Sequence, residues 1–425
     1  MTTLAERSLA LHAHYRGKIQ SAPKVPVTGL ADYNLWYTPG VAEPCLAIAA
    51  EPERVWELTN RGNTVAIVSD GTRVLGLGDI GPLAGLPVME GKALIFKLLG
   101  GVDAVPLMLA VSEPDAFCAT VAAVAPTFGG INLEDIAQPR CFELLSRLRP
   151  ALDIPVWHDD QQGTATVALA AVLNALSLVG KPLGKVRIAL VGMGAANVAV
   201  YRLLKVAGAD PGAIIACDAG GTLHRGRRDL EAQAEVAPQW SICLESNAEG
   251  IVGGIPEALA GADVALAFSR PGPDVIRPEW IAAMARDAIV IAGANPVPEI
   301  HPQAALAAGA RIVGTGRSDF PNQVNNALAF PGIFRGVLDV QARTITDTMA
   351  VAAAEALAGC AHDGGICEDH ILPTLEEPEV AVRVAVATGL AAQAEGVARR
   401  PGTAAELEAR ARTAITAAQR LALLW

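Results

Sequence analysis

The chain has 425 residues, a formal net charge of −11 at pH 7 and 52% hydrophobic residues, with aromatics at only 4%. This length exceeds one ordinary hydrophobic core and therefore predicts two domains. The acidic balance, with a pI near 5.2, argues against an extended basic face of the kind that binds nucleic acid. Forty-one glycines and a positive mean hydropathy favour an α/β protein with tight turns and close helix–sheet contacts.

The amino-terminal segment predicts no secretory signal, because charges recur from Glu6 onward without a continuous apolar run. The longest uncharged stretch, Thr164 to Gly180, falls just short of a bilayer span and is rich in alanine, so we expect a buried helix and no membrane contact. Seven scattered cysteines are typical of reduced thiols. These features predict a cytoplasmic protein that acts on small molecules.

Residues 1–160 mix short β-like runs with loops rich in glycine and proline. The runs are "TVAIVSD" and "AVPLML", and the most prominent loop is "GTRVLGLGDIGPLAGLPVMEGK". We expect this part to form an α/β domain that handles the substrate.

From Lys185 the pattern becomes regular, with short apolar strands that alternate with helical segments. The strands lie in "VRIALVGMG", "AIIACDAGG", "ADVALAFSRPG", "AIVIAGANP" and "RIVGTG". This alternation predicts a doubly wound parallel sheet of Rossmann type over residues 161–395. Residues 396–425 carry apolar positions at three- and four-residue spacing, which predicts a helical tail.

A glycine-rich turn follows the first of these strands and opens a helix, which is the context of a dinucleotide-binding fingerprint. In "VGMGAAN", Gly192 would form the turn, and Gly194 would let a pyrophosphate approach the amides of Ala195 and Ala196. Asn197 stands at the position of the third glycine in this fingerprint. We therefore expect the affinity or the pose of the cofactor to be unusual.

The strand "IIACD" ends on Asp218, and an acid at this point accepts hydrogen bonds from an adenosine ribose and disfavours a 2′-phosphate. The cofactor is therefore expected to be NAD or NADP, with a slight preference for NAD. The preference is only slight because basic residues follow that could hold a 2′-phosphate: His224, Arg225, Arg227 and Arg228.

Two acidic pairs precede the long uncharged helix, Glu134 and Asp135 in "GGINLEDI" and Asp159 and Asp160 in "VWHDDQQGT". Each pair alone has an ordinary explanation, as a solvated loop or as the N-cap of the following helix. Together they could supply three hard oxygen ligands to an octahedral cation and leave positions for a chelating substrate. Such a site suits Mg²⁺ or Mn²⁺ better than Zn²⁺.

Ordered blocks of the chain resemble the successive motifs of malic enzymes over nearly all of the sequence to about residue 395. The blocks are "YTPGVAEPCLAIA", "SDGTRVLGLGDIGPLAGLPVMEGKALIFK", "FGGINLEDI", "HDDQQGTATV", "AGANPVPEI" and "TGRSDFPNQVNNALAFPGIFRG". The chain is similar to the shorter bacterial type, without a fused phosphotransacetylase-like domain. The resemblance implies metal-dependent oxidative decarboxylation of L-malate to pyruvate and CO₂ with NAD or NADP, in a homodimer or higher homo-oligomer.

The resemblance also implies roles for particular residues. Lys92 in "MEGKA" corresponds to the general base, and Tyr37 in "WYTPG" corresponds to the proton donor. Asp159 would orient neighbouring groups. The metal ligands correspond to Glu134, Asp135 and Asp160.

In that chemistry Lys92 takes the substrate's hydroxyl proton while hydride leaves C2 for the nicotinamide. Loss of CO₂ follows, with the cation stabilising the enolate, and Tyr37 then protonates C3. Arg73 in "DGTRVLG" matches a carboxylate-binding arginine, although a structural salt bridge would explain it as well. Further substrate contacts correspond to Asn295, which also lines the cofactor crevice at the end of a strand, and to Asn325 and Asn326.

One departure from the family pattern is Gln162, which replaces the usual histidine after "HDDQ" and could change the pH dependence or the substrate. A malolactic-type enzyme would share every site. An amino-acid dehydrogenase would have no use for the acids, and a non-catalytic malate- or nucleotide-binding homologue would need no proton donor. The spacing in "GCAHDGGICEDH" matches no zinc site that we can justify, so we expect ordinary thiols in a loop at Cys360, His362, Cys367 and His370.

Overall fold

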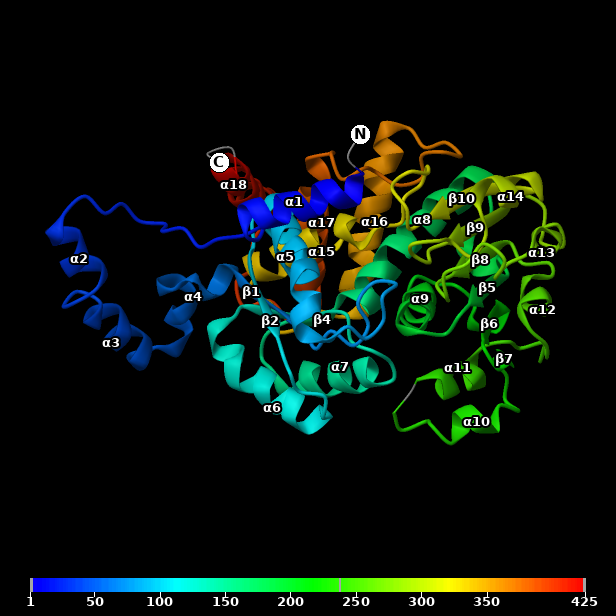
Figure 1. Ribbon diagram of the computed structural model, residues 1–425, viewed down its shortest axis with the longest axis horizontal. Coiled ribbons are helices and arrows are strands. Elements are labelled where there is room, and N and C mark those ends of the chain that lie inside the picture. The colour runs from blue at the N-terminus through cyan, green and yellow to red at the C-terminus, as the bar shows by residue number, and fades with distance from the viewer. Residues whose placement is uncertain (1–2, 237, 423–425) are drawn as a thin grey trace.

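The computed structural model describes residues 3–236 and 238–422, whose strands form two sheets (Figure 1). The first sheet is entirely parallel in the order β2-β1-β3-β4. Its strands are β1 (Thr64–Ser69), β2 (Asp103–Met108), β3 (Gly130–Leu133) and β4 (Val156–His158). Every residue of β1, β3 and β4 is buried, as expected for parallel strands covered on both faces.

The second sheet has the order β10-β9-β8-β5-β6-β7 and is parallel except for β7, which pairs antiparallel with β6. Its strands are β5 (Ile188–Val191), β6 (Ile214–Asp218), β7 (Gly221–Thr222), β8 (Val264–Ala267), β9 (Ala288–Ala292) and β10 (Ala310–Thr315). The predicted doubly wound, Rossmann-like sheet is confirmed. The short edge strand β7 was not expected.

The helices that accompany the first sheet are α1 (Leu4–Tyr15), α2 (Leu30–Trp36), α3 (Ala42–Ala50), α4 (Val55–Leu58), α5 (Gly81–Gly100), α6 (Pro114–Val124), α7 (Arg140–Ala151) and α8 (Thr164–Val179). Those along the second sheet are α9 (Ala195–Val206), α10 (Arg228–Glu231), α11 (Gln239–Glu245), α12 (Ile255–Leu259), α13 (Pro278–Ile281) and α14 (Pro302–Ala307). The carboxyl-terminal helices are α15 (Phe330–Asp339), α16 (Asp347–Gly364), α17 (Glu379–Ala394) and α18 (Ala404–Ala422).

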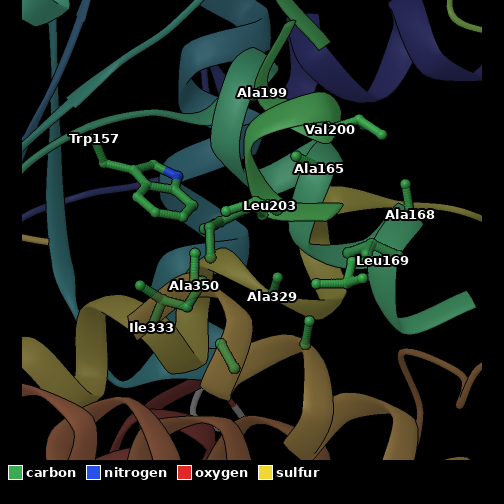
Figure 2. Packing of buried hydrophobic residues seen from close by; sticks show 14 of the residues in the cluster. Trp157, Ala165, Ala168, Leu169, Ala199, Val200, Leu203, Ala329, Ile333 and Ala350 are labelled. Atoms are coloured by element: carbon green, nitrogen blue, oxygen red, sulfur yellow. The ribbon is translucent and has the colours of Figure 1, made fainter. Parts of the chain in front are cut away.

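Helix α8 connects the two sheets and is the predicted buried helix. With the turn before it, the segment Asp159–Val179 is long and apolar enough to cross a membrane, but 72% of its most apolar window is buried inside the protein. Figure 2 shows its small residues Ala165 and Ala168 among side chains of α9 and α15. Because alanine is small, these helices approach closely. The apolar surface of α8 is therefore buried against other helices of the protein.

The carboxyl-terminal helices contact both parts of the chain. Helix α16 packs on α8 and α9, whereas α15 and α18 pack on α5, which lies beside the first sheet. A Cβ atom on Gly101, directly after α5, would lie 2.6 Å from the carbonyl carbon of Ala414 in α18. Helices α15–α18 therefore join the two parts of the chain.

The first four helices lie at the outside of the molecule. Within the described residues, α1, α2, α3 and α4 contain no buried side chain. Figure 1 shows α2 and α3 extending away from both sheets. Large apolar side chains are exposed on them, namely Leu30, Tyr33, Leu35, Trp36 and Leu46.

Candidate active site

The acidic residues predicted from the sequence lie at the carboxyl ends of β3 and β4. Leu133 pairs with His158 in the parallel register of these strands. The residues that follow must therefore emerge side by side, and Glu134 and Asp135 lie next to Asp159 and Asp160 for this reason.

Lys92 of helix α5 reaches these acids from the side. Its Nζ atom lies 2.8 Å from Oε1 of Glu134, and it also forms an ion pair with Asp159. The same ammonium lies 4.2 Å from the centre of the Phe330 ring. Only 8% of the Lys92 side chain is exposed, so the ammonium is held by two carboxylates in a largely dry environment.

The protonation of Lys92 follows from these contacts. Burial by itself lowers the pKa of a lysine, but the charges of Asp159 and Glu134 outweigh burial, and the net pKa of Lys92 is raised. In this arrangement Lys92 keeps its proton. To act as the predicted general base, Lys92 must lose this proton, which both carboxylates oppose while they contact it.

Neutral donors fix the second oxygen of each partner carboxylate. Asn132 donates from Nδ2 to Oε2 of Glu134 at 2.9 Å, and Trp157 donates from Nε1 to Oδ1 of Asp159 at 2.9 Å. Asp159 thus contacts the candidate base directly.

Asp135 and Asp160 are linked through the main chain. The amide of Asp135, whose φ is +53°, donates to Oδ2 of Asp160 at 2.8 Å. Burial, and secondly the charge of Asp160, raise the pKa of Asp135 to about 8. Burial also raises the pKa of Glu134 well above its ordinary value. The single ammonium of Lys92 therefore does not compensate the charge of all these buried acids.

These acids fit a hard divalent cation by their chemistry. The buried Oδ2 of Asp135 has no hydrogen-bond partner among the described residues, and carboxylate oxygens are the ligands that Mg²⁺ and Mn²⁺ prefer. In residues 3–236 and 238–422, however, no three His, Cys, Asp or Glu side chains already converge on a common point. The donor set is present, but Lys92 is paired with one of its members.

The sequence analysis missed a buried histidine behind this cluster. His158 is fully buried, and its Nδ1 atom lies 3.7 Å from Oδ2 of Asp160. Burial lowers its pKa, so the ring is neutral. Gln162, which replaces the family's usual histidine, accepts a hydrogen bond from the amide of His158 at 3.1 Å. The sequence feature that could have identified His158 is its position at the end of a strand, directly before Asp159 and Asp160.

Arg73 lies close to the acids through its main chain, because its amide donates to the carbonyl of Asp135 at 3.0 Å. Its exposed side chain forms no ion pair with any described residue, which leaves its guanidinium able to bind a carboxylate. A second arginine, Arg140, was not predicted. It pairs with Asp70 and donates to Thr72 at 3.0 Å, and so supports the loop that carries Arg73.

The predicted asparagines approach the acids from other parts of the chain. Asn325 accepts a hydrogen bond from the amide of Ala327 at 2.9 Å and begins the short turn Asn326–Leu328. This turn packs against the π-helical turn that contains Asp159 and Asp160. A Cβ atom on Gly76 would lie 3.0 Å from the carbonyl oxygen of Asn295, so the loop after Arg73 touches the loop after β9.

The glycine-rich turn is tightly packed at Gly192 and open at Gly194. Gly192 has φ +86°, and a Cβ atom there would lie 2.7 Å from the side chain of Ser269. Gly194 caps the helix that starts with Ala195, and a Cβ atom there would meet nothing closer than 3.9 Å. The helix amino terminus is therefore open to a phosphate.

Asn197 braces this turn. Its side-chain amide donates to the carbonyls of Val191, Gly192 and Leu266 at 3.0, 2.7 and 3.2 Å. It is fully buried and joins the ends of β5 and β8. This bracing gives a structural reason for an asparagine in place of the third glycine.

Glu299 is a further buried residue that the sequence analysis missed. Its carboxylate accepts hydrogen bonds from the amide of Ser269 at 2.7 Å and from the amide of Ala294 at 3.0 Å. It thereby holds together the loops that follow β8 and β9. These loops flank the glycine-rich turn and the candidate residue Asn295.

Tyr37 does not join the site within one chain. It directly follows α2, and 73% of it is exposed to solvent. Figure 1 shows α2 and α3 on the part of the chain that extends away from the sheets. The structure thus brings together Lys92 and the acids but leaves the predicted proton donor outside.

Comparisons with known proteins agree with this arrangement. The sequence profile of the malic enzyme N-terminal domain matches residues 16–149, and that of the malic enzyme NAD binding domain matches residues 278–394. The chain is 47% identical to an NAD-dependent malic enzyme of Geobacillus stearothermophilus, over 91% of this chain and 79% of that protein. It is 46% identical to a bifunctional malic/malolactic enzyme of Bacillus subtilis, over 93% of this chain and 95% of that protein.

Solved structures give the same result. A malic enzyme of Entamoeba histolytica matches with a TM-score of 0.95 at 46% identity and covers 99% of this chain and 88% of its own. A malic enzyme of Pyrococcus horikoshii matches with a TM-score of 0.93 at 51% identity and covers 97% of this chain and 96% of its own. Because both family profiles match and these relatives align with nearly the whole chain, this chain belongs to the malic enzyme family.

Proposed function

We propose that this protein oxidises and decarboxylates L-malate to pyruvate and CO₂ and reduces a nicotinamide cofactor. The observation that carries the proposal is the buried lysine–carboxylate cluster of Lys92, Glu134 and Asp159, with Asp135 and Asp160 beside it. A sensor or a structural protein gains nothing from burying these charges, because each costs desolvation free energy. A family enzyme uses such groups for proton transfer and for binding a cation.

Glu134, Asp135 and Asp160 would hold Mg²⁺ or Mn²⁺, which when bound acidifies the substrate hydroxyl and stabilises the enolate. Lys92 accepts the hydroxyl proton at Nζ once fewer carboxylates contact it, because burial then lowers its pKa toward the range of a base. Asp159 keeps Nζ in place. Arg73 and Asn325 bind substrate oxygens, and Arg73 suits a carboxylate by its fork of donors.

We further propose a homodimer in which Tyr37 enters the site of the partner. The exposed apolar side chains on α2 and α3 support this proposal, because a surface of this kind is usually covered in an assembly. In the partner's site the Tyr37 hydroxyl would donate the proton to C3.

The arrangement of Tyr37 can be tested by mixing two inactive variants, Lys92→Ala and Tyr37→Phe. If Tyr37 acts across the interface, a mixed dimer has one intact site, and random mixing restores about a quarter of the wild-type activity. If Tyr37 acts within its own chain, every site in the mixture lacks one group and no activity returns.

The cofactor is NAD or NADP, bound by Gly192, Gly194 and the first amides of α9, with Asp218 at the adenosine ribose. We favour NAD because Asp218 ends β6 and repels a 2′-phosphate. All seven cysteines are free, which supports a cytoplasmic location.

The decisive experiment follows NAD or NADP reduction with L-malate, with and without Mn²⁺, and quantifies pyruvate. We expect metal-dependent reduction with one pyruvate for each reduced cofactor. The Bacillus subtilis relative makes malolactic activity the second candidate. That activity would release lactate without net reduction. No product from malate under any condition would contradict both candidates.

Binding of Mn²⁺ can be measured independently of enzyme activity through the melting temperature of the protein. Mn²⁺ should raise the melting temperature of the wild-type protein, because a ligand that binds only the folded state stabilises it. Asp135→Asn should abolish this increase. An equal increase in the variant would remove Asp135 from the ligand set.

A further inference from the structure

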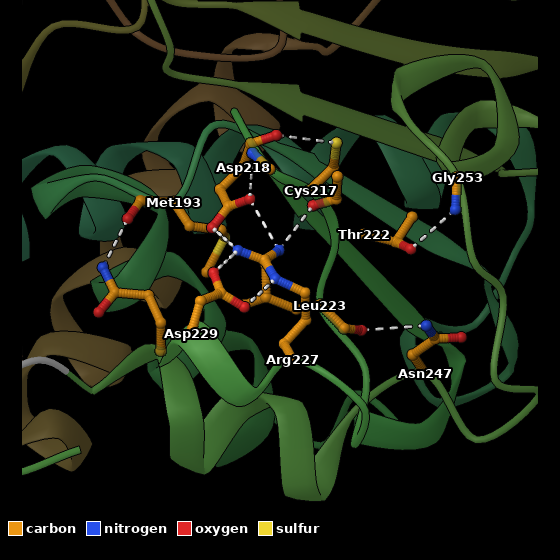
Figure 3. Close-up of polar contacts among 12 residues, drawn as sticks. Met193, Cys217, Asp218, Thr222, Leu223, Arg227, Asp229, Asn247 and Gly253 are labelled. Atoms are coloured by element: carbon orange, nitrogen blue, oxygen red, sulfur yellow. Dashed lines mark hydrogen bonds and ion pairs between the residues drawn. The ribbon is translucent and has the colours of Figure 1, made fainter. Parts of the chain in front are cut away.

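Beside Asp218, the last residue of strand β6, Arg227 is held between two acids (Figure 3). Nη1 and Nη2 of Arg227 donate to the two carboxylate oxygens of Asp218 at 2.8 and 2.9 Å. Nε and Nη2 donate to the two oxygens of Asp229 at 2.8 and 2.7 Å. Both contacts are bidentate, which is the strongest geometry for this pair of groups.

These contacts use the whole donor capacity of Arg227. A guanidinium has five N–H groups. Four donate to the carboxylates, and the remaining one lies 3.3 Å from the carbonyl oxygen of Gly221. With only 10% of its side chain exposed, Arg227 has no donor left for a ligand.

The charge balance of the cluster is also unfavourable for an anion. One guanidinium and two carboxylates leave a net charge of minus one. Hydrogen bonds from Arg227 lower the pKa of Asp229, so Asp229 stays ionised at neutral pH. A 2′-phosphate placed beside Asp218 would meet this negative charge with no free donor.

The other basic residues nearby are partly engaged as well. Arg228 pairs with Glu231 at 2.5 Å, and Arg225 donates to the carbonyl of Leu244 at 3.3 Å. Arg227 is the residue of this basic run that lies nearest to Asp218, and its donors are all engaged. It is therefore not available to bind a 2′-phosphate. Removal of Asp229 would free Nε and one hydrogen of Nη2 on Arg227.

We propose that Asp229 sets the cofactor preference of this protein by holding Arg227 against Asp218, so that the adenosine site accepts a ribose and rejects a 2′-phosphate. Asp229 is a positioning residue, since it acts on the cofactor only through Arg227. The inference rests on the proposed function in one respect, that Asp218 faces the adenosine ribose.

The test compares Asp229→Ala and Asp229→Asn with Glu231→Gln in the full-length protein. Glu231→Gln removes the same charge from the same short helix but leaves Arg227 untouched. Dissociation constants for NAD, NADP, 5′-AMP and 2′-AMP are measured by calorimetry without substrate or metal. The Asp229 side chain is 57% exposed, so the variants should fold, and a melting curve checks this.

The expected result is a shift of the NAD-to-NADP affinity ratio toward NADP on the order of tenfold in Asp229→Ala, the size of one regained charge-assisted hydrogen bond. 2′-AMP should gain affinity in parallel, and Glu231→Gln should leave the ratio unchanged. An unchanged ratio in both Asp229 variants, or an equal shift in Glu231→Gln, would overturn the inference alone. Wild-type protein that binds neither dinucleotide would overturn the proposed function together with it.

Discussion

At the scale of residues, Lys92 shows how neighbours decide the chemistry of one group. Its two carboxylate partners stand 42 and 67 positions away in the sequence, and both are buried. Removal of either carboxylate leaves part of the Lys92 charge uncompensated, whereas removal of Lys92 together with Asp159 eliminates both charges of that pair and leaves only Glu134 unpaired.

This asymmetry gives a prediction for Asp159→Asn, which keeps the shape of the side chain and its contact with Trp157. The free energy of unfolding of this variant, measured by urea denaturation, should be about 3 kcal/mol lower than that of the wild type. Lys92→Met should be destabilising as well, but the double variant should lose clearly less than the sum. Additive losses would mean that the two side chains are not energetically coupled.

At the scale of elements, two helices end on glycines with left-handed φ, Gly101 after α5 and Gly180 after α8. A Cβ atom on Gly180 would meet nothing within 4 Å, whereas one on Gly101 would meet the main chain of α18 at Ala414. The pair therefore separates the cost of the backbone conformation from the cost of the contact with α18.

Gly180→Ala should cost about 1 kcal/mol of unfolding free energy, the penalty for a left-handed alanine. Gly101→Ala should cost a further 1–3 kcal/mol, roughly, because α18 must shift from α5. Denaturant unfolding of both variants measures the difference. Equal costs would show that α18 does not press on the end of α5.

At the scale of the whole molecule, Asp103 at the start of β2 joins distant segments. It accepts hydrogen bonds from Lys97 at 2.7 Å, from Asn63 at 2.9 Å and from Asn60 at 3.1 Å. Burial alone would raise its pKa, but these hydrogen bonds outweigh burial and lower it. The folded state therefore favours the ionised carboxylate.

The ionisation of Asp103 makes the free energy of unfolding depend on pH. Because the pKa of Asp103 is lower in the folded state, its stabilisation is complete above the unfolded-state pKa of about 4 and is lost below it, as the pH falls through the folded-state pKa. Asp103→Asn should flatten this acid limb in a plot of unfolding free energy against pH. Asp115→Asn, at an exposed position, controls for the change in net charge. An acid limb as steep in Asp103→Asn as in wild type would contradict the assignment.

Although it did not predict β3, β4 or β7 as strands, the sequence by itself determined the other strands of both sheets, the turn at Gly192 and the two acidic pairs as candidates for one site. These features depend on local patterns, because continuous apolar runs predict buried parallel strands and parallel strands end at one edge. The two acidic pairs could be proposed as hard oxygen ligands from their residue types, whereas the resemblance to malic enzymes selected Glu134, Asp135 and Asp160 among them. The resemblance to malic enzymes added Lys92 and Tyr37, which no local pattern distinguishes from an ordinary lysine and tyrosine.

Only the tertiary structure decided how these residues meet. It paired Lys92 with Glu134 and Asp159, engaged Arg227 between two acids, packed α15 and α18 on α5 and left Tyr37 outside. The physical reason is that a local pattern fixes which face of an element is apolar, whereas the partner of a buried charge is chosen by segments that meet only when the chain has folded.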